Sequence, residues 1–322
     1  MSEMSYRRLG ASGLSVSVVG LGCNNFGRKL DIDATREVVD AAIDAGITLF
    51  DTADIYGTPH GGSEVCLGAA LKGRRDEVVL ATKFGMPMGG LNGNDFGARG
   101  SRRYIVRAVE TSLRRLETDY IDLYQMHQPD AATPIDETLA ALDDLVRAGK
   151  VRYLGNSNFD GWQIADADWT ARAGNHTPFI SAQNRYSLLR REVEAEVVPA
   201  CEHFGLGLLP FFPLDSGLLS GKYQRGERPA GGTRLALDRY QAVLANADWD
   251  TIEALTAFGA ERGHSLLDVA IAGLAARPAV ASVIAGATTA EQVQANAAAG
   301  EWQFDADDVT ALDNLLSAST SR

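Results

Sequence analysis

The sequence is poor in the features that mark secreted, membrane and metal-binding proteins. Its three cysteines, Cys23, Cys66 and Cys201, are far apart and odd in number, so they predict no disulfide framework. No segment approaches about 18 unbroken apolar residues, and the N-terminus leads into no apolar signal sequence. The five histidines show no HExxH or other ligand spacing. We therefore expect a cytoplasmic protein without a metal site.

Positive charge is also scarce. The chain has 30 Lys and Arg against 42 Asp and Glu, which gives a formal net charge of −12. Nucleic acids and anionic membranes attract positive surfaces, so this balance argues against general binding to either. An anionic ligand would have to be held locally, by helix N-termini, backbone amides or a few basic side chains.

Short apolar runs alternate with amphipathic stretches along the whole chain, and no linker or change of composition divides it. This order predicts an α/β fold, a single (β/α)8 barrel domain over residues 1–322. A turn at residues 10–13 predicts an N-terminal hairpin, and extra helices are expected near residues 249–262 and 305–317. The eight expected strands, several of them apolar throughout, are residues 17–22, 48–51, 78–83, 121–125, 151–157, 179–183, 207–211 and 280–284.

The intervening helices carry start and stop signals. Asp33 is expected to cap the first helix, and Gly46 to end it in a left-handed conformation. Pro134 is expected at a first helical position, and Thr289 with Gln292 predicts a capping box after the eighth strand. Two long connections, residues 86–102 and 223–248, follow the third and seventh strands and are candidate lids.

Polar side chains follow three consecutive expected strands. Asp51 ends the second strand and Tyr56 follows it, Lys83 ends the third, and His127 follows the fourth. A phenol titrates near pH 10; a nearby ammonium lowers its pKa, and a carboxylate keeps that ammonium charged and aimed. With an imidazole to orient a carbonyl oxygen, the set predicts protonation of an oxygen as hydride reaches its carbon.

Each of these residues also has a simpler interpretation. Asp51 is of a type that often serves as a helix cap or turn residue, and Tyr56 could pack on the surface. Lys83 could be a solvated strand end, and His127 a half-buried histidine with its hydrogen bonds satisfied. Their shared position at one edge of one barrel favours the catalytic interpretation.

Nine short motifs follow one another along the chain. They are RRLGASGLSVS at residues 7–17, GLGC at 20–23, FDTADIYG at 50–57, GSEVCLG at 62–68, ATKF at 81–84, DYIDLYQMH at 119–127, GNSNF at 155–159, QNRYS at 183–187 and GLLSGKY at 217–223. In their order and spacing these motifs resemble those of the aldo-keto reductases, and the resemblance covers essentially the whole chain. The branch that the chain most resembles is bacterial and similar to potassium-channel β subunits.

The resemblance implies an enzyme that reduces aldehydes or ketones to alcohols by direct hydride transfer. Tyr56 would be the general acid or base, Lys83 its activator, Asp51 the partner of that lysine, and His127 the group that orients the carbonyl. The cofactor would be NADPH/NADP, with NADH possible, and it would bind without a Rossmann fold. The other partner would be a small carbonyl substrate.

The family resemblance also implies where the cofactor lies. Ser157, Asn158 and Gln183 would hold its carboxamide, and Phe211 would stack on the nicotinamide ring. Arg234 would clamp a 2′-phosphate, unless it is a solvated loop charge. The other residues expected at the cofactor are Gly22, Cys23, Asn24, Phe212, Pro213, Leu214, Gly217 and Lys222, and, at the adenosine end, Gly286, Thr288, Gln292 and Asn296.

The chain departs from the family pattern at several positions near the cofactor. Phe212 stands where a serine is usual, and Asp215 replaces a small residue and must point away or pair with Lys222. Ala295 replaces the glutamate that often precedes Asn296, and no arginine lies between residues 285 and 296. The residues expected around the substrate pocket are Asn24, Asn25, Ile55, Met86 and Gln128.

Two other functions stay open at this point. One is a non-catalytic or slow module that binds the cofactor as a redox sensor, as resemblance to channel β subunits permits. The other is a lyase or isomerase in which Lys83 forms a Schiff base, which would leave Ser157, Asn158 and Gln183 unexplained. The sequence predicts no particular oligomer, because no exposed heptad or apolar stripe marks an interface.

Overall fold

Eight parallel strands lie side by side in one sheet. The computed structural model describes residues 4–231 and 233–320. The strand order in the sheet is β10, β3, β4, β5, β6, β7, β8 and β9. Their bounds are Val19–Gly22 (β3), Leu49–Asp51 (β4), Val79–Phe84 (β5), Ile121–Met126 (β6), Val151–Ser157 (β7), Phe179–Gln183 (β8), Gly207–Leu208 (β9) and Val283–Gly286 (β10).

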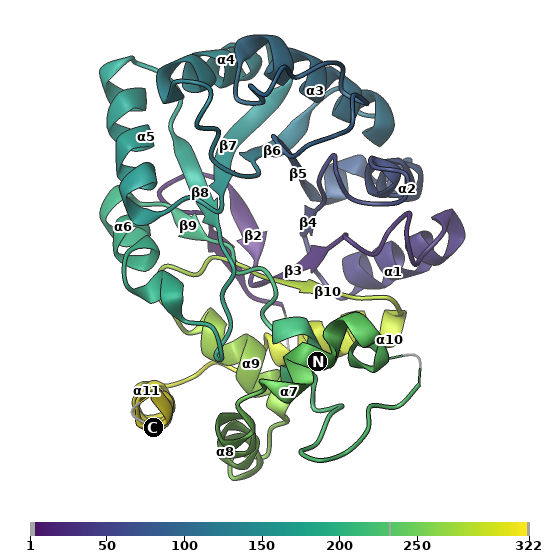
Figure 1. Ribbon diagram of the computed structural model, residues 1–322, viewed down its shortest axis with the longest axis vertical. Coiled ribbons are helices and arrows are strands. Elements are labelled where there is room, and N and C mark those ends of the chain that lie inside the picture. The colour runs from purple at the N-terminus through teal and green to yellow at the C-terminus, as the bar shows by residue number, and fades with distance from the viewer. Residues whose placement is uncertain (1–3, 232, 321–322) are drawn as a thin grey trace.

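The sheet curls until its two outer strands meet. Leu208 of β9 forms a parallel bridge with Val280, and Phe211 forms one with Ile284 of β10. The backbone N–H of Leu208 also donates to the carbonyl of Ala279 at 2.7 Å. Because the two edges bond to each other, the sheet closes, and helices surround it (Figure 1). The expected (β/α)8 barrel fold is confirmed.

The helices follow the strands around the barrel. The two extra helices expected from the sequence are α8 and α11, which pack on each other outside the barrel (Figure 1). The helices are α1 Ile32–Asp44, α2 Gly62–Ala70, α3 Arg102–Leu116, α4 Ile135–Arg147, α5 Gly161–Ala173, α6 Val197–Phe204, α7 Gln241–Ala245, α8 Trp249–Ala260, α9 Leu266–Ala275, α10 Ala290–Ala299 and α11 Ala306–Thr320.

The predicted N-terminal hairpin is present and closes one end of the barrel. Its strands are β1 (Tyr6–Arg8) and β2 (Ser15–Ser17). Leu9 and Val16 belong to a buried apolar cluster with Leu49, Ala81 and Leu123, which come from β4, β5 and β6. Burying these side chains stabilises the barrel. It also makes the N-terminal end of the interior apolar, so the polar interior positions lie nearer the C-terminal ends of the strands.

Several predicted strand bounds were wrong by a few residues. Ser17 belongs to the hairpin, so the first barrel strand begins at Val19. β9 ends at Leu208, two residues before Pro210, which has no N–H for a sheet hydrogen bond. The last strand begins at Val283 and not at residue 280. Residues 280 and 211 still take part in the single bridges that close the barrel.

The helix signals were right in kind and shifted in position. Asp31, not Asp33, caps α1, because its side chain accepts the N–H of Ala34 three residues on. Pro134 has an extended ψ of 138°, so α4 begins one residue later than expected. Gly46 has the expected left-handed φ of 79°.

The signal at the start of α10 holds only in part. The predicted cap is present, because Thr289 accepts the N–H of Gln292. The side-chain oxygen of Gln292 reaches back to the N–H of Thr288 at 2.9 Å, one residue before the cap. The reciprocal bond of a capping box is therefore displaced by one residue.

We predict that Gly68→Ala destabilises the protein. A Cβ at Gly68 in α2 would lie 2.7 Å from the carbonyl carbon and oxygen of Leu116 at the end of α3. Such overpacking should lower the free energy of unfolding by about 2 kcal/mol. Urea unfolding followed by circular dichroism measures it. The control is Gly13→Ala, where the nearest atom is 4.0 Å away; equal unfolding midpoints for the two variants would contradict the prediction.

Candidate active site

Four polar side chains form a layer inside the barrel, next to the apolar layer. They are Asp51 from β4, Lys83 from β5, Gln125 from β6 and Gln183 from β8, and each is at most 3% exposed. The first three lie two residues after Leu49, Ala81 and Leu123 of the apolar cluster, so they point to the same inner face. The alternation of the strands thus delivers a carboxylate, an ammonium and two amides to one level of the interior.

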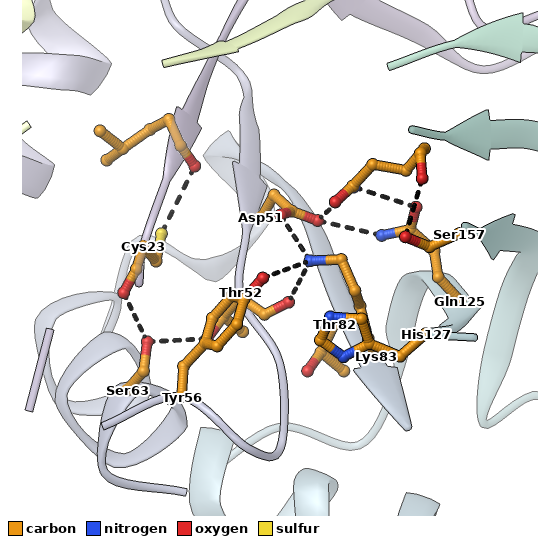
Figure 2. Close-up of polar contacts among 12 residues, drawn as sticks. Cys23, Asp51, Thr52, Tyr56, Ser63, Thr82, Lys83, Gln125, His127 and Ser157 are labelled. Carbon is orange, nitrogen blue, oxygen red and sulfur yellow. Dashed lines mark hydrogen bonds and ion pairs between the residues drawn. The ribbon is translucent and has the colours of Figure 1, made fainter. Parts of the chain in front are cut away.

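The Asp51 carboxylate is the centre of this layer. Its Oδ2 accepts a hydrogen bond from Lys83 Nζ at 2.6 Å. Its Oδ1 accepts one from Gln125 Nε2 at 3.0 Å and one from Gln183 Nε2 at 2.9 Å. Figure 2 shows the carboxylate between the ammonium and the amide of Gln125. Three N–H donors therefore replace the water that this buried charge gives up.

Tyr56 approaches the ammonium from the loop after β4. Its hydroxyl lies 3.5 Å from Lys83 Nζ. Its backbone carbonyl accepts the N–H groups of Gly61 and Ser63, both at 3.1 Å, where α2 begins. Ser63 also donates its hydroxyl to the carbonyl of Cys23 at 2.7 Å. These bonds tie the Tyr56 turn to α2 and to the first barrel strand (Figure 2).

His127 completes the group. Its ring meets the Tyr56 ring edge to face, with centroids 5.7 Å apart. Its Nδ1 is buried and has no hydrogen-bond partner in the described part of the chain. Asn158 Nδ2 donates to the His127 carbonyl at 2.9 Å, which holds the end of β6 beside β7. The structure therefore brings Asp51, Tyr56, Lys83 and His127 together, as the sequence predicts.

Burial and charge set the protonation states here. Burial, with the charge of Lys83, lowers the pKa of His127 to about 3, so the ring is neutral near pH 7. Burial raises the pKa of Tyr56 above its usual 10, and this outweighs the opposite effect of the Lys83 charge. The net direction is thus opposite to the sequence expectation. For Lys83, burial acts to lower the pKa, but Asp51 and Tyr56 raise it overall.

A cavity of about 810 Å³ opens in front of these groups. It is lined by Asp51, Tyr56 and His127, while Lys83 lies behind them and is fully buried. The residues predicted to contact a cofactor also line it: Gly22, Cys23, Asn24, Ser157, Asn158, Gln183, Phe211, Phe212, Pro213, Leu214, Gly217, Lys222, Arg234, Gly286, Thr288, Gln292 and Asn296.

Comparison with known proteins agrees with this arrangement. The model of the Aldo/keto reductase family matches residues 18–317. The chain belongs to the aldo-keto reductase family. It is 38% identical to the uncharacterized oxidoreductase YrpG of Bacillus subtilis, over 97% of this chain and 96% of that protein. Aldo-keto reductases are oxidoreductases that generally use nicotinamide cofactors.

Two further relatives carry different names. A probable voltage-gated potassium channel subunit beta of Oryza sativa subsp. japonica is 39% identical, over 91% of this chain and 90% of its own. The L-glyceraldehyde 3-phosphate reductase of Escherichia coli strain K12 is 32% identical, over 91% of this chain and 87% of its own. The names of these relatives therefore include both a channel subunit and a reductase.

Of the five residues expected around a substrate in this aldo-keto reductase, two line the cavity and three do not. Asn24 and Asn25 line the cavity, and Asn25 donates to the carbonyl of Ala287 beside β10. Ile55, Met86 and Gln128 are not among the residues that line it, so their contact with a substrate stays a prediction.

Sequence reasoning missed several residues of the site. Gln125 lies two residues after Leu123 of the apolar cluster on β6, so strand alternation could have indicated it. Lys29 also lines the cavity, from the loop after β3, and no motif marks it. The other cavity residues that were not predicted are Ser216, Ser220, Tyr223, Gly231, Thr233, Leu267, Ile284 and Glu291.

Asp215 was expected to point away from the pyrophosphate or to pair with Lys222, and its ion-pair partners are instead two arginines. Asp215 is buried, and its carboxylate binds Arg185 at 2.6 Å and Arg190 at 3.6 Å. It lies in a left-handed stretch, with φ of 39° at Asp215, 65° at Ser216 and 106° at Gly217. Consecutive residues with positive φ are costly and need support, and the ion pairs give it. They also compensate a carboxylate near the expected pyrophosphate position.

The charges that line the cavity oppose the net charge of the chain. Lys29, Lys222 and Arg234 are the basic residues of the lining. Glu291 lies in the first turn of α10, where the helix dipole favours a negative group. The Asp51 charge is paired with Lys83 behind the cavity. This local excess of positive charge is suited to an anionic ligand despite the acidic surface.

The long connection after β5 is anchored beside the Tyr56 turn. Asn92 is 3% exposed, and its Nδ2 donates to Asp54 Oδ2 at 2.8 Å and to the Tyr104 hydroxyl at 3.4 Å. Burial and the nearby charge of Glu64 raise the pKa of Asp54 well above its usual value. One of the contacts that hold the candidate lid therefore lies at Asp54, two residues before Tyr56 in the chain.

The described residues contain neither a candidate metal site nor a candidate membrane span. No group of three or more His, Cys, Asp and Glu side chains within residues 4–231 and 233–320 is arranged to hold a metal ion. Over the same part of the chain, each helix is too short or too polar to span a bilayer.

We predict that His127 stays neutral across the physiological pH range. Its lowered pKa of about 3 places protonation below about pH 5, since burial disfavours the charged ring. Proton NMR of the imidazole C–H resonances from about pH 5 to pH 8 tests this, with His127→Asn to assign the signal. A resonance of His127 that titrates near pH 6.5 would show that the ring is solvated.

Proposed function

We propose that this protein reduces aldehydes or ketones to alcohols with a nicotinamide cofactor, and that Tyr56 donates the proton. The observation that carries the proposal is the position of the Tyr56 hydroxyl. It lies 3.5 Å from the Lys83 ammonium and at the wall of a cavity that His127 also lines. We further propose that residues 1–322 act as one domain, because the family match and the barrel span nearly all of them.

The lining of the cavity fits the proposed cofactor. Lys29, Lys222 and Arg234 provide positive charge for phosphates, and the N-terminus of α10 adds a favourable dipole. Ser216 and Gly217 line the cavity, and the absence of a side chain at Gly217 suits close approach of a pyrophosphate. Phe211 supplies a flat apolar face for an aromatic ring. Bound there, the cofactor would supply the hydride.

The protonation states suit reduction. The raised pKa keeps the Tyr56 phenol protonated at neutral pH, so it is ready to act as an acid. When the proton leaves, the Lys83 ammonium stabilises the phenolate, and Asp51 keeps that ammonium charged. Neutral His127 has one ring N–H with which to orient a carbonyl oxygen.

Cofactor preference follows from the charged residues that line the cavity. Arg234 and Lys29 favour a ligand with an extra phosphate, so we propose NADPH over NADH. Ala295 gives no acceptor to the adenine amine, and Glu291 in the lining opposes a nearby phosphate. The preference is therefore expected to be modest.

Two other functions are weighed against the same contacts. A Schiff base at Lys83 is disfavoured, because Nζ is buried and donates to Asp51 Oδ2, to the Thr52 carbonyl and to the Tyr56 hydroxyl. A redox-sensing module that binds the cofactor without turnover is the second alternative, and the name of the Oryza relative, a probable channel subunit, fits it in part. Tight binding of NADPH without reduction of any aldehyde would support that second function.

We predict that Tyr56→Phe abolishes most turnover and leaves cofactor binding nearly intact. Loss of a positioned acid should lower kcat by about 100-fold or more. NADPH oxidation at 340 nm with an aldehyde panel gives the rate, and fluorescence titration gives Kd. The matched control is Tyr6→Phe, because the Tyr6 hydroxyl bonds the Gly46 carbonyl at the other end of the barrel. A near-normal rate for Tyr56→Phe would remove the acid assignment.

We predict that Arg234→Ala weakens NADPH more than NADH. Loss of one charge-assisted hydrogen bond to a phosphate should raise Kd for NADPH by about tenfold, with little effect on NADH. Arg228→Ala is the control, since Arg228 belongs to the same loop and lines a different surface hollow. Equal effects on the two cofactors would place Arg234 away from the 2′-phosphate.

A further inference from the structure

Gln125 is a buried polar residue with no role in the proton transfer proposed above. It is fully buried on β6, opposite Lys83 in the register of the two strands. On its other side, β7 carries Gly155, where a Cβ would lie 3.0 Å from Gln125 Cγ. A glycine there gives the Gln125 side chain room to extend across the interior to Asp51.

The hydrogen bonds of Gln125 are consistent with only one assignment of its amide nitrogen and oxygen. A carboxylate accepts hydrogen bonds, so the atoms of Gln125 and Gln183 that face Asp51 Oδ1 must both be Nε2. Gln125 Oε1 is then turned to Gln183, and it accepts a second N–H from Gln183 Nε2 at 3.2 Å. The charge of Asp51 therefore determines the orientation of both amides.

The orientation of the Gln183 amide determines which of its atoms faces the cavity. Its Nε2 has two N–H groups, which point to Asp51 and to Gln125. Its Oε1 lies on the opposite side of the amide, and Gln183 lines the cavity. Without Gln125, one of the two contacts that distinguish Nε2 from Oε1 would be lost, and the amide could rotate by half a turn at lower cost.

We propose that Gln125 is a positioning residue that orients Gln183 so that its carbonyl oxygen accepts an N–H from the carboxamide of the nicotinamide cofactor. This inference rests on the proposed function. It extends that function by linking recognition of the carboxamide to the carboxylate that holds Lys83. The cofactor is then selected for an amide donor and not only for its ring.

A pair of coenzymes tests this orientation directly. One is NADPH, and the other is its 3-acetylpyridine analogue, in which a methyl ketone without N–H groups replaces the carboxamide. Fluorescence titration gives Kd for each coenzyme. The measured quantity is the Kd of the analogue divided by the Kd of NADPH, so a larger ratio means a stronger preference for NADPH. The wild-type chain should prefer NADPH, and Gln125→Met should reduce that preference about fivefold, the usual effect of one hydrogen bond.

Two further variants separate positioning from general damage. Ser181→Ala removes a buried hydroxyl without a partner in the described chain, next to Gly155 in the same interior, and should leave the ratio unchanged. In a Gln183→Met background, Gln125→Met should change the ratio no further, because Gln125 acts through Gln183. If Gln125→Met does not fold, Gln125→Asn, which draws the amide back by one methylene, should reduce the ratio in the same direction.

The outcomes are distinguishable from failure of the proposed function. If Gln125→Met binds both coenzymes with an unchanged ratio, or weakens both equally, Gln125 does not orient Gln183 and this inference is wrong. If the wild-type chain binds neither coenzyme, the proposed function itself fails, and the inference fails with it. A lowered ratio with Ser181→Ala as well would indicate a loosened interior and would also overturn it.

Discussion

The buried ion pair between Lys83 and Asp51 is the interaction on which the site depends. Its atoms are 2.6 Å apart, and the two side chains are 0% and 4% exposed. Charges without water are costly, and removing one partner of such a pair costs about 3–5 kcal/mol. The cost is compensated here because Asp51 accepts amide bonds from two other strands and Lys83 also donates to a backbone carbonyl. Through the Asp51 carboxylate, the ion pair and its hydrogen bonds therefore connect four strands of the barrel, β4, β5, β6 and β8.

The interior of the barrel is divided into an apolar layer and a polar layer, and this division keeps the ion pair in a defined environment. The hairpin fills the N-terminal end with Leu9 and Val16, and the same strands that contribute Leu49, Ala81 and Leu123 turn polar two residues later. Water is kept from the pair on one side by this apolar layer, while the other side opens to the cavity. Burial therefore raises the pKa of Tyr56 and lowers that of His127, and both shifts keep these groups in the neutral form.

The sequence predicted the parts of the site that follow from strand ends. Asp51, Lys83 and His127 end or follow parallel strands, whose carboxyl ends must meet at one face of a barrel. The exact ends of strands and helices did not follow from the sequence. Asp31 and Asp33 are equally good N-caps by residue type, and only the hydrogen bond from the Ala34 N–H to Asp31 shows which of them caps α1. Asp215 could not be assigned, since its partners Arg185 and Arg190 come from the loop after β8, which no local pattern connects to it.

The amino-acid sequence by itself determined the alternation of strands and helices, the family, and the residue types at the mouth of the barrel, because these depend on local periodicity and motif spacing. Only the tertiary structure decided the net direction of the Tyr56 pKa, the hydrogen bond between Gln125 and Asp51, and the anchoring of the β5–α3 connection through Asn92. Those properties depend on burial and on contacts between distant segments. Both are absent until the strands close on one another.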